Sequence, residues 1–328
     1  MLLPALAALA AFAPAPPDTT VTAFVDVTVI PMDRERTLPG QTVLVRDGKV
    51  VALGRAGAVA VPTGARRVDG RGKFLLPGLA EMHAHVPGGN APDADIERVL
   101  LLYAANGITT IRGMLGHPRH LELRAKLARG DILGPRLVTS GPSLNGSSVP
   151  DWATAQRLVA EQKAAGYDFL KIHPGIAQPA FDSLAAAAAR AGMRLAGHVP
   201  LDVGLEGALR HRFWTIDHLD GYAEALAEGN PPAPAPASQF FGANLAPWFD
   251  ESRMAELVRR TRDAGVAQVP TEILFDNLAE PDGVAALRDR PEHRYVSRQS
   301  VEQWAGQSAG IATQLGPSAL RDLVAMRR

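Results

Sequence analysis

The segment FLLPGLAEMHAHV, residues 74–86, places two histidines, His83 and His85, at the end of an apolar run. Side chains two residues apart lie on the same face of a β-strand, so we expect both imidazoles to point the same way. Neutral imidazole is a common ligand for zinc and related metals. The pair therefore supplies either half of a metal site or two polar residues that end a strand.

Other side chains that could complete such a site occur late in later apolar segments. They are Lys171 in DFLKIH, His198 in RLAGHV and His218 in TIDHL. An ammonium group cannot bind a metal, but burial lowers the pKa of a lysine. The neutral amine can then react with carbon dioxide to give a carbamate, whose two oxygens can bridge two metals. The alternative is an ordinary strand-end lysine that reaches solvent or pairs with a carboxylate.

The elements that must position these residues alternate between apolar strands and helical patterns from residue 74 onwards. The candidate strands are residues 74–83, 108–114, 136–141, 168–173, 194–199, 215–219 and 267–274. Helical patterns lie between them, as in 151–166, where Asp151 is a suitable N-cap and Gly166 a suitable stop. This alternation predicts an α/β fold in which parallel strands close into a (β/α)8-type TIM barrel. The active site of such a barrel lies at the C-terminal ends of the strands.

Seven strands can be identified, and the sequence then ends in the helical pattern SALRDLVAMRR. We therefore expect a chain truncated before its eighth strand, or else a strand that the pattern does not reveal. Residues 20–73 alternate in short segments, and RDGKV at residues 46–50 predicts a β-hairpin. The predicted domains are a leader over 1–19, a small β domain over 20–73 and an incomplete barrel over 74–328.

The composition limits the classes of partner. Lys+Arg and Asp+Glu both number 34, so the formal net charge of zero gives no reason to expect nucleic acid. The absence of cysteine excludes disulfides and thiolate metal sites. The apolar N-terminus, with small residues in AFA and APA, predicts a signal peptide and hence an exported protein, periplasmic or secreted. The alternative is an Ala-rich N-terminal extension, and no later apolar run approaches the length of a membrane span.

The segments LPGLAEMHAH, DFLKIHPGI, LAGHVP and TIDHLDGY resemble motifs of the amidohydrolase superfamily, in its imidazolonepropionase-like and prolidase-like branch. The resemblance extends over about residues 21–328. It implies a small β-sandwich beside a TIM barrel, and two divalent metal ions, with zinc the expected element. It also implies the metal ligands, which are His83 and His85 for the first ion, Lys171 as a bridging carbamate, and His198 and His218 for the second ion.

The resemblance implies hydrolysis of a C–N bond in a small-molecule amide, dipeptide or cyclic amide, with a metal-bridging hydroxide as the nucleophile. The family uses an Asp at the end of strand eight as its general acid–base group, and no such Asp is found here. Glu272, which we expect on strand seven, is a conceivable substitute. Two alternatives stay open: a lactonase or esterase that uses the same site, and a non-catalytic truncated fragment.

Three further residues are candidates for contact with substrate. His173 shares a face with Lys171, and it could contact substrate or hold a neighbouring group by a hydrogen bond. Tyr222 could bond the substrate carbonyl or simply pack in a loop. Arg112 could meet a substrate carboxylate, although an internal ion pair is favoured. The expected partner is a small molecule, and a homo-oligomer is left open.

Overall fold

The computed structural model describes residues 20–229, 238, 240–279 and 283–327. The predicted leader, residues 1–19, lies outside this range. The chain divides into two compact units at Gly78 and Leu79, and each unit is described by itself.

The first unit is a five-stranded sheet in which the main strand order is β3-β2-β1-β4, with β5 also paired to β1. Its strands are β1 (Val21–Val29), β2 (Leu38–Arg46), β3 (Lys49–Arg55), β4 (Arg66–Asp69) and β5 (Phe74–Leu75). Asp47 and Gly48 connect β2 to β3 with φ values of 50° and 72°. These are the left-handed conformations of a type I′ turn, so the predicted hairpin is confirmed.

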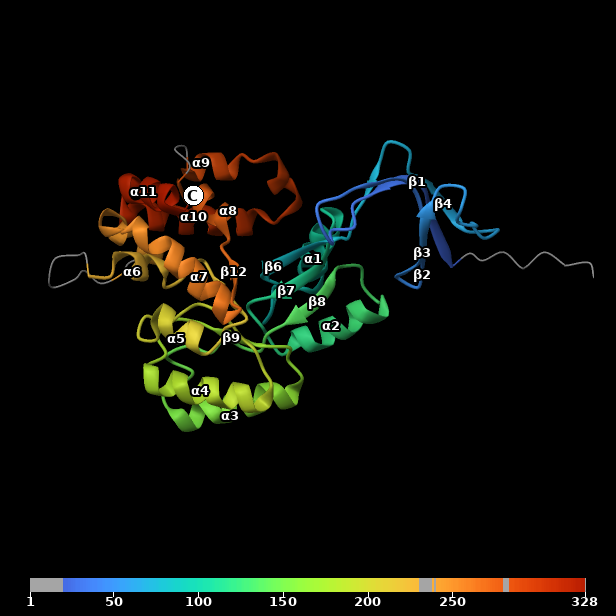
Figure 1. The fold of residues 1–328 in the computed structure, drawn as a ribbon. Helices are drawn as coiled ribbons and strands as arrows, with labels where there is room; N and C mark the ends of the chain where they lie inside the picture. The colour runs from blue at the N-terminus through green and yellow to red at the C-terminus, as the bar shows by residue number, and fades with distance from the viewer. Residues whose placement is uncertain (1–19, 230–237, 239, 280–282, 328) are drawn as a thin grey trace, which may run out of the picture. The chain divides into compact units, whose positions relative to one another are not determined.

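The second unit alternates strands with helices and ends in a group of helices (Figure 1). Its first part contains β6 (Leu79–Ala84), α1 (Asp93–Ala105), β7 (Ile108–Gly113), α2 (Arg119–Arg129), β8 (Arg136–Thr139), α3 (Trp152–Ala165), β9 (Leu170–Ile172), α4 (Gln178–Ala191), β10 (Leu195–Gly197), α5 (Gly204–Arg210), β11 (Thr215–Asp217) and α6 (Tyr222–Ala227). Its second part contains the 3-10 segments η1 (Phe240–Trp248) and η2 (Glu251–Arg253), then α7 (Met254–Ala264), β12 (Ala267–Val269), α8 (Glu272–Ala279), α9 (Gly283–Arg288), η3 (Pro291–Tyr295), α10 (Arg298–Leu315) and α11 (Pro317–Arg327).

The strands of this unit are all parallel and follow the order of the chain. They form one sheet of β6-β7-β8 and another of β9-β10-β11-β12. Two isolated parallel bridges, Ser140 to Phe169 and Leu144 to Ile172, join the segment after β8 to β9. The mixed α/β fold with parallel strands is thus confirmed. Within the described residues no backbone pairing joins β12 to β6, so the closed barrel stays a prediction.

The apolar core fixes the direction in which β9 presents its side chains. Leu170 and Ile172 are buried in the same cluster as Phe181 of α4 and Val159 of α3. Because side chains alternate along a strand, Lys171 points away from these helices and into the other face of the sheet. The helix α3 begins and ends as predicted, with the Asp151 carboxylate accepting from the Thr154 amide.

Two predicted strands are wrong in their extent. Residues 74–83 form β5 and β6 rather than one strand, because Pro77 and Gly78 interrupt the run. The strand predicted over 267–274 ends at Val269. Pro270 has no N–H to continue the ladder, so Glu272 is not on a strand but is the first residue of α8. In the part of the chain that the structure describes, no helix is both long and apolar enough to cross a bilayer.

Candidate active site

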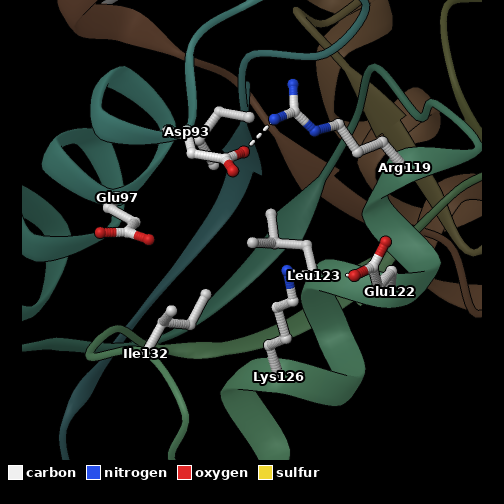
Figure 2. Close-up of a pocket in the computed structure, with 8 residues that line it drawn as sticks. Asp93, Glu97, Arg119, Glu122, Leu123, Lys126 and Ile132 are labelled. Carbon is white, nitrogen blue, oxygen red and sulfur yellow. Dashed lines mark hydrogen bonds and ion pairs between the residues drawn. The ribbon is translucent and has the colours of Figure 1, made fainter.

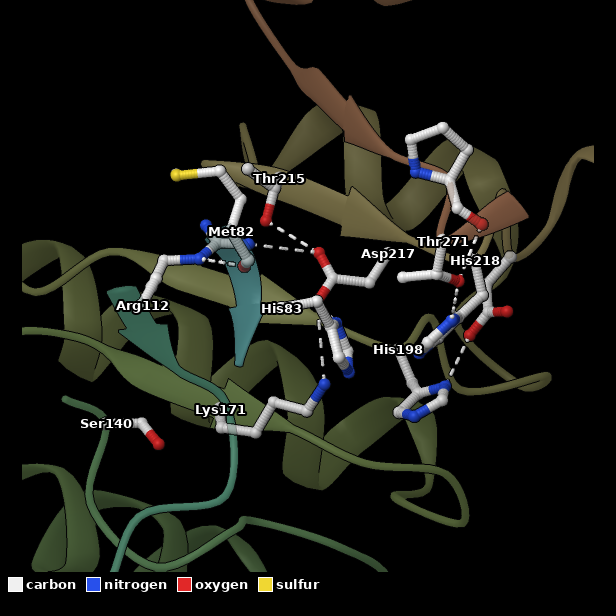
Figure 3. Close-up of polar contacts among 12 residues, drawn as sticks. Met82, His83, Arg112, Ser140, Lys171, His198, Thr215, Asp217, His218 and Thr271 are labelled. Carbon is white, nitrogen blue, oxygen red and sulfur yellow. Dashed lines mark hydrogen bonds and ion pairs between the residues drawn. The ribbon is translucent and has the colours of Figure 1, made fainter. Parts of the chain in front are cut away.

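Five histidines come together where the parallel strands end (Figure 3 labels three of them). The ring centroid of His83 lies 5.2 Å from that of His85 and 4.6 Å from that of His218. The ring of His198 lies 4.7 Å from His218 and 5.0 Å from His173. The structure therefore gathers all four histidines predicted to bind metal, together with the predicted substrate contact His173.

Lys171 projects into this cluster from the middle of β9 (Figure 3). The residue is fully buried, and its Nζ has no hydrogen-bond partner within the described residues. The nearest carboxylate oxygen, Oδ2 of Asp217, is 3.6 Å away. Desolvation lowers the pKa of this amine to about 8, although the charge of Asp217 opposes the shift. The amine is thus much closer to its neutral form at pH 7 than an exposed lysine would be.

Asp217 is the central carboxylate of the site, and sequence reasoning missed it. It is fully buried and accepts hydrogen bonds from His83 Nδ1 (2.8 Å), Thr215 Oγ1 (2.9 Å) and the Arg112 guanidinium (3.3 Å). Burial by itself would raise the Asp217 pKa, but the bond from His83 and the charge of Lys171 outweigh it and lower the pKa to about 2. Arg112 therefore makes the internal ion pair that was favoured for it.

One signal in the sequence could have identified Asp217. It is an acid in the short buried strand β11, directly before His218, and a buried acid needs a partner. Strict alternation places adjacent residues on opposite faces, which would separate Asp217 from the site. However, His218 has a φ of 63° and lies beyond the end of the strand, so alternation does not apply to it.

Two of the histidines are oriented by carboxylates. His83 Nδ1 bonds Asp217, and His198 Nδ1 bonds Asp220 Oδ2 at 2.8 Å. Asp217, with its lowered pKa, is ionised at neutral pH and can only accept, so the proton lies on His83 Nδ1. The Asp220 carboxylate is placed to accept the Nδ1 proton of His198 with the same geometry. This leaves a lone pair on each Nε2, the form in which imidazole binds a metal, and such carboxylate partners are typical of metal ligands.

The remaining histidines are held in the neutral form. Desolvation, together with neighbouring positive charge, lowers the pKa of His85 and His173 to about 4 and that of His218 to about 2. All three are therefore neutral at pH 7. Neutral imidazoles are available as metal ligands, whereas imidazolium is not.

The donor set fits a divalent metal by its chemistry. The described residues contain no three His, Asp or Glu side chains that already converge on one point as metal ligands. The fit rests instead on the buried Lys171 amine without a hydrogen-bond partner and on the Nε2 lone pairs beside it. Imidazole and oxygen donors suit zinc and several other divalent ions.

Two other predicted residues, Tyr222 and Glu272, form side-chain interactions with groups outside the histidine cluster. The Tyr222 hydroxyl lies 2.5 Å from Thr261 Oγ1 and accepts a hydrogen bond from Gln268, and burial raises its pKa. The Glu272 carboxylate pairs with Arg327 at 2.8 Å. Both groups thus already have partners, and a catalytic role for either one stays a prediction.

Apart from the histidine cluster, a small hollow lies between α1 and α2 (Figure 2). Its volume is about 40 Å³, which is enough for a water molecule or two but not for a substrate. Four of its charged lining groups form ion pairs with one another, Asp93 with Arg119 and Glu122 with Lys126. This hollow therefore does not compete with the histidine cluster as a candidate active site.

The fold and the cluster together define an α/β enzyme whose site is built on the ends of parallel strands. Residues 74–294 match the model of the Amidohydrolase family, so the chain belongs to that family. Its members generally bind divalent metal ions. Hydrolytic chemistry is thus supported at the level of the family.

Individual relatives are more distant. An adenine deaminase of Mesorhizobium japonicum is 26% identical over 183 residues, which are 51% of this chain and 30% of the relative. The chain thus spans about a third of that relative's length. A solved bottromycin amidohydrolase superposes with a TM-score of 0.62 at 22% identity, covering 94% of this chain and 64% of that one. A Xaa-Pro dipeptidase with bound methionine in its active site gives a TM-score of 0.55 at 15% identity, covering 93% and 77%. These two likenesses concern the fold.

Proposed function

We propose that this chain hydrolyses a C–N bond of a small substrate, an amide, a dipeptide or a cyclic amide, at a metal centre held by the histidine cluster. The observation that carries the proposal is the fully buried Lys171 amine, which has no hydrogen-bond partner among the described residues and lies beside histidines with strongly lowered pKa values. A buried amine without a partner is unfavourable unless it has a function. Conversion of the Lys171 amine to a metal-binding carbamate would give it such a function.

In this proposal the side chains divide into two sets of metal ligands around a shared one. The first set is His83 and His85, the second is His198 and His218, and the shared ligand is the carbamate of Lys171. The seven parallel strands would belong to a TIM barrel, since these groups all lie on a parallel strand or directly after one. When bound, divalent ions polarise the scissile carbonyl and lower the pKa of water, so that attack is feasible at neutral pH.

The remaining polar groups orient these ligands and the substrate. Asp217 and Asp220 hold the Nδ1 protons of His83 and His198, which fixes the direction of each Nε2. Arg112 neutralises Asp217 from the buried side. His173 is assigned to substrate contact, because it lies beside His198 and is neutral at pH 7.

The test is the metal content of the purified chain after expression with zinc and bicarbonate. We expect about two ions per chain, and a sharp fall in Lys171→Ala. The matched control is Lys126→Ala, since Lys126 is exposed and pairs with Glu122 on the same helix. Metal contents that are equal in Lys171→Ala and the parent would contradict the proposal.

Activity should then be measured on dipeptides, N-acyl amino acids and cyclic amides. Lactones and esters serve as competing substrate classes, because the same chemistry attacks any activated carbonyl. Turnover confined to lactones or esters would replace the C–N assignment and leave the metal centre intact.

A further inference from the structure

The chain makes a strained turn directly after β12, and the turn carries a hydroxyl to the histidine cluster. Thr271 has a φ of 56°, a conformation that β-branched residues rarely adopt. Its Oγ1 lies 2.7 Å from Nδ1 of His218 (Figure 3). Glycine would adopt this backbone without strain, so the presence of threonine calls for a function of its side chain.

The hydrogen bonds around Thr271 determine which atom donates. The Thr271 hydroxyl donates its single proton to the carbonyl of Pro270 at 2.6 Å. It can therefore only accept from His218, so the His218 proton lies on Nδ1. The lone pair of His218 is then on Nε2, as it is in His83 and His198. The Thr271 hydroxyl thus orients His218, just as the carboxylates of Asp217 and Asp220 orient His83 and His198.

A buried arginine holds this turn in place. Arg327 of α11 donates to the carbonyl of His218 and to the carbonyl of Pro270, each at 2.8 Å. Its guanidinium also pairs with Glu272 and lies 3.5 Å from the ring centroid of Phe275. The Arg327 side chain is only 3% exposed. Because one guanidinium bonds the ends of both β11 and β12, the distance between His218 and Thr271 is fixed by the backbone as well.

We propose that Thr271 is a positioning residue whose hydroxyl fixes the tautomer and direction of His218, so that Nε2 is presented as a metal ligand. The role of Thr271 in metal binding rests on the proposed metal centre. The hydrogen bond between Thr271 and His218 is present in the metal-free protein. It explains why a strained threonine stands where the backbone favours glycine.

The first measurement is made without metal. Histidine labelled with ¹⁵N is incorporated, and the His218 signals are identified by their loss in His218→Gln. We expect the Nδ1–H tautomer in the parent chain and in Thr271→Ser, which keeps the hydroxyl. In Thr271→Val, which keeps the shape and the strain but not the hydroxyl, we expect a mixture with the Nε2–H tautomer.

The second measurement is zinc affinity in the presence of bicarbonate. We expect Thr271→Val to bind the zinc ion that His218 contacts about 10–100-fold less tightly than the parent does. The affinity of Thr271→Ser for this ion should stay within about threefold of the parent's affinity. Thr271→Gly relieves the strain and also lacks the hydroxyl, so it should be folded and should lose affinity as Thr271→Val does.

An unchanged tautomer in Thr271→Val would overturn the inference, and so would equal losses of zinc affinity in the Val and Ser variants. If the tautomer changes but even the parent chain binds no zinc, the metal centre of the proposed function fails, and the metal role of Thr271 fails with it. The two failures are therefore distinguishable.

Discussion

Nδ1 of His83 lies 2.8 Å from Oδ2 of Asp217, although the two residues are 134 positions apart in the chain. His83 belongs to β6 of the three-stranded sheet, and Asp217 ends β11 of the four-stranded sheet. The hydrogen bond therefore joins the two sheets through the candidate active site. The groups that would orient a metal ligand are the same groups that hold the strand ends together.

Replacement of Asp217 by asparagine should destabilise the metal-free protein. Asp217→Asn keeps the shape but leaves the buried Arg112 guanidinium without its counter-ion, and breaking a buried pair in this way typically costs about 3 kcal/mol or more. The control is Thr215→Val, which removes one hydrogen bond to the Asp217 carboxylate, worth about 1.5 kcal/mol or more, and leaves its charge and its pair with Arg112 in place. Urea unfolding of the metal-free proteins measures both, and equal losses would show that the charge of Asp217 is unimportant.

Gly197 should not tolerate a side chain. Its φ is 121°, and a Cβ atom would come within 2.5 Å of the Ile172 carbonyl oxygen and 2.7 Å of Lys171 Cδ. Gly197→Ala should therefore displace Lys171, lower the free energy of unfolding by about 2 kcal/mol or more, and reduce the bound metal.

Gly192 provides the matched control for this prediction. Its φ is 62°, but a Cβ atom there would meet nothing within 4 Å. Gly192→Ala should cost about 1 kcal/mol through backbone strain alone, with metal content unchanged. If the two variants bind metal equally well, the close approach of Gly197 to Lys171 is not needed for the site.

Much of the fold can be predicted from local patterns in the sequence. The hairpin at Asp47 and Gly48 and the start of α3 at Asp151 depend on single residues with strong local preferences. The strand β9 was also recognisable, because Leu170 and Ile172 are apolar on both sides of Lys171. The end of β12 was misjudged because the apolar pattern continues past Pro270 into α8.

The candidate site could be predicted only in part. The histidines and Lys171 were recognised by residue type and by their place late in the strands. Asp217 and Thr271 were not, because their contacts with His83 and His218 depend on positive φ values and on packing between distant strands. The positive φ of Thr271 has no local signal in the sequence, because threonine is a residue type that normally avoids this conformation.

Lys171 should be dispensable for folding if its role is to bind metal. Lys171→Met preserves most of the side-chain volume and removes an amine that is buried without a hydrogen-bond partner. We expect the metal-free variant to be at least as stable as the parent, because burial of the charged amine is unfavourable. Thermal unfolding of the metal-free proteins, with Lys126→Met as the exposed control, tests this. A large loss of stability in Lys171→Met would instead indicate a structural ion pair with Asp217.

His120 should make the stability of the metal-free protein depend on pH. This histidine of α2 is fully buried, its Nε2 lies 3.2 Å from the Pro87 carbonyl oxygen, and its Nδ1 has no hydrogen-bond partner within the described residues. Desolvation lowers its pKa, with opposition from the bond to Pro87 and some support from the nearby His117 and Arg119. The folded chain therefore keeps His120 neutral at a pH where the unfolded chain protonates it.

Since the unfolded state binds the extra proton, the free energy of unfolding should fall as the pH drops below about 6.5, by at most about 1.4 kcal/mol per pH unit for this one group. His120→Met removes the titration and also loses one hydrogen bond, so it should be less stable than the parent at pH 7.5. At pH 5.5 the difference between the two proteins should be smaller, by at most about 1.4 kcal/mol, because only the parent must keep His120 neutral in the folded state. Urea unfolding at both values measures the difference, and other titrating groups cancel because both proteins contain them. A difference that is the same at pH 7.5 and 5.5 would mean that His120 accepts its proton in the folded chain as readily as in the unfolded one.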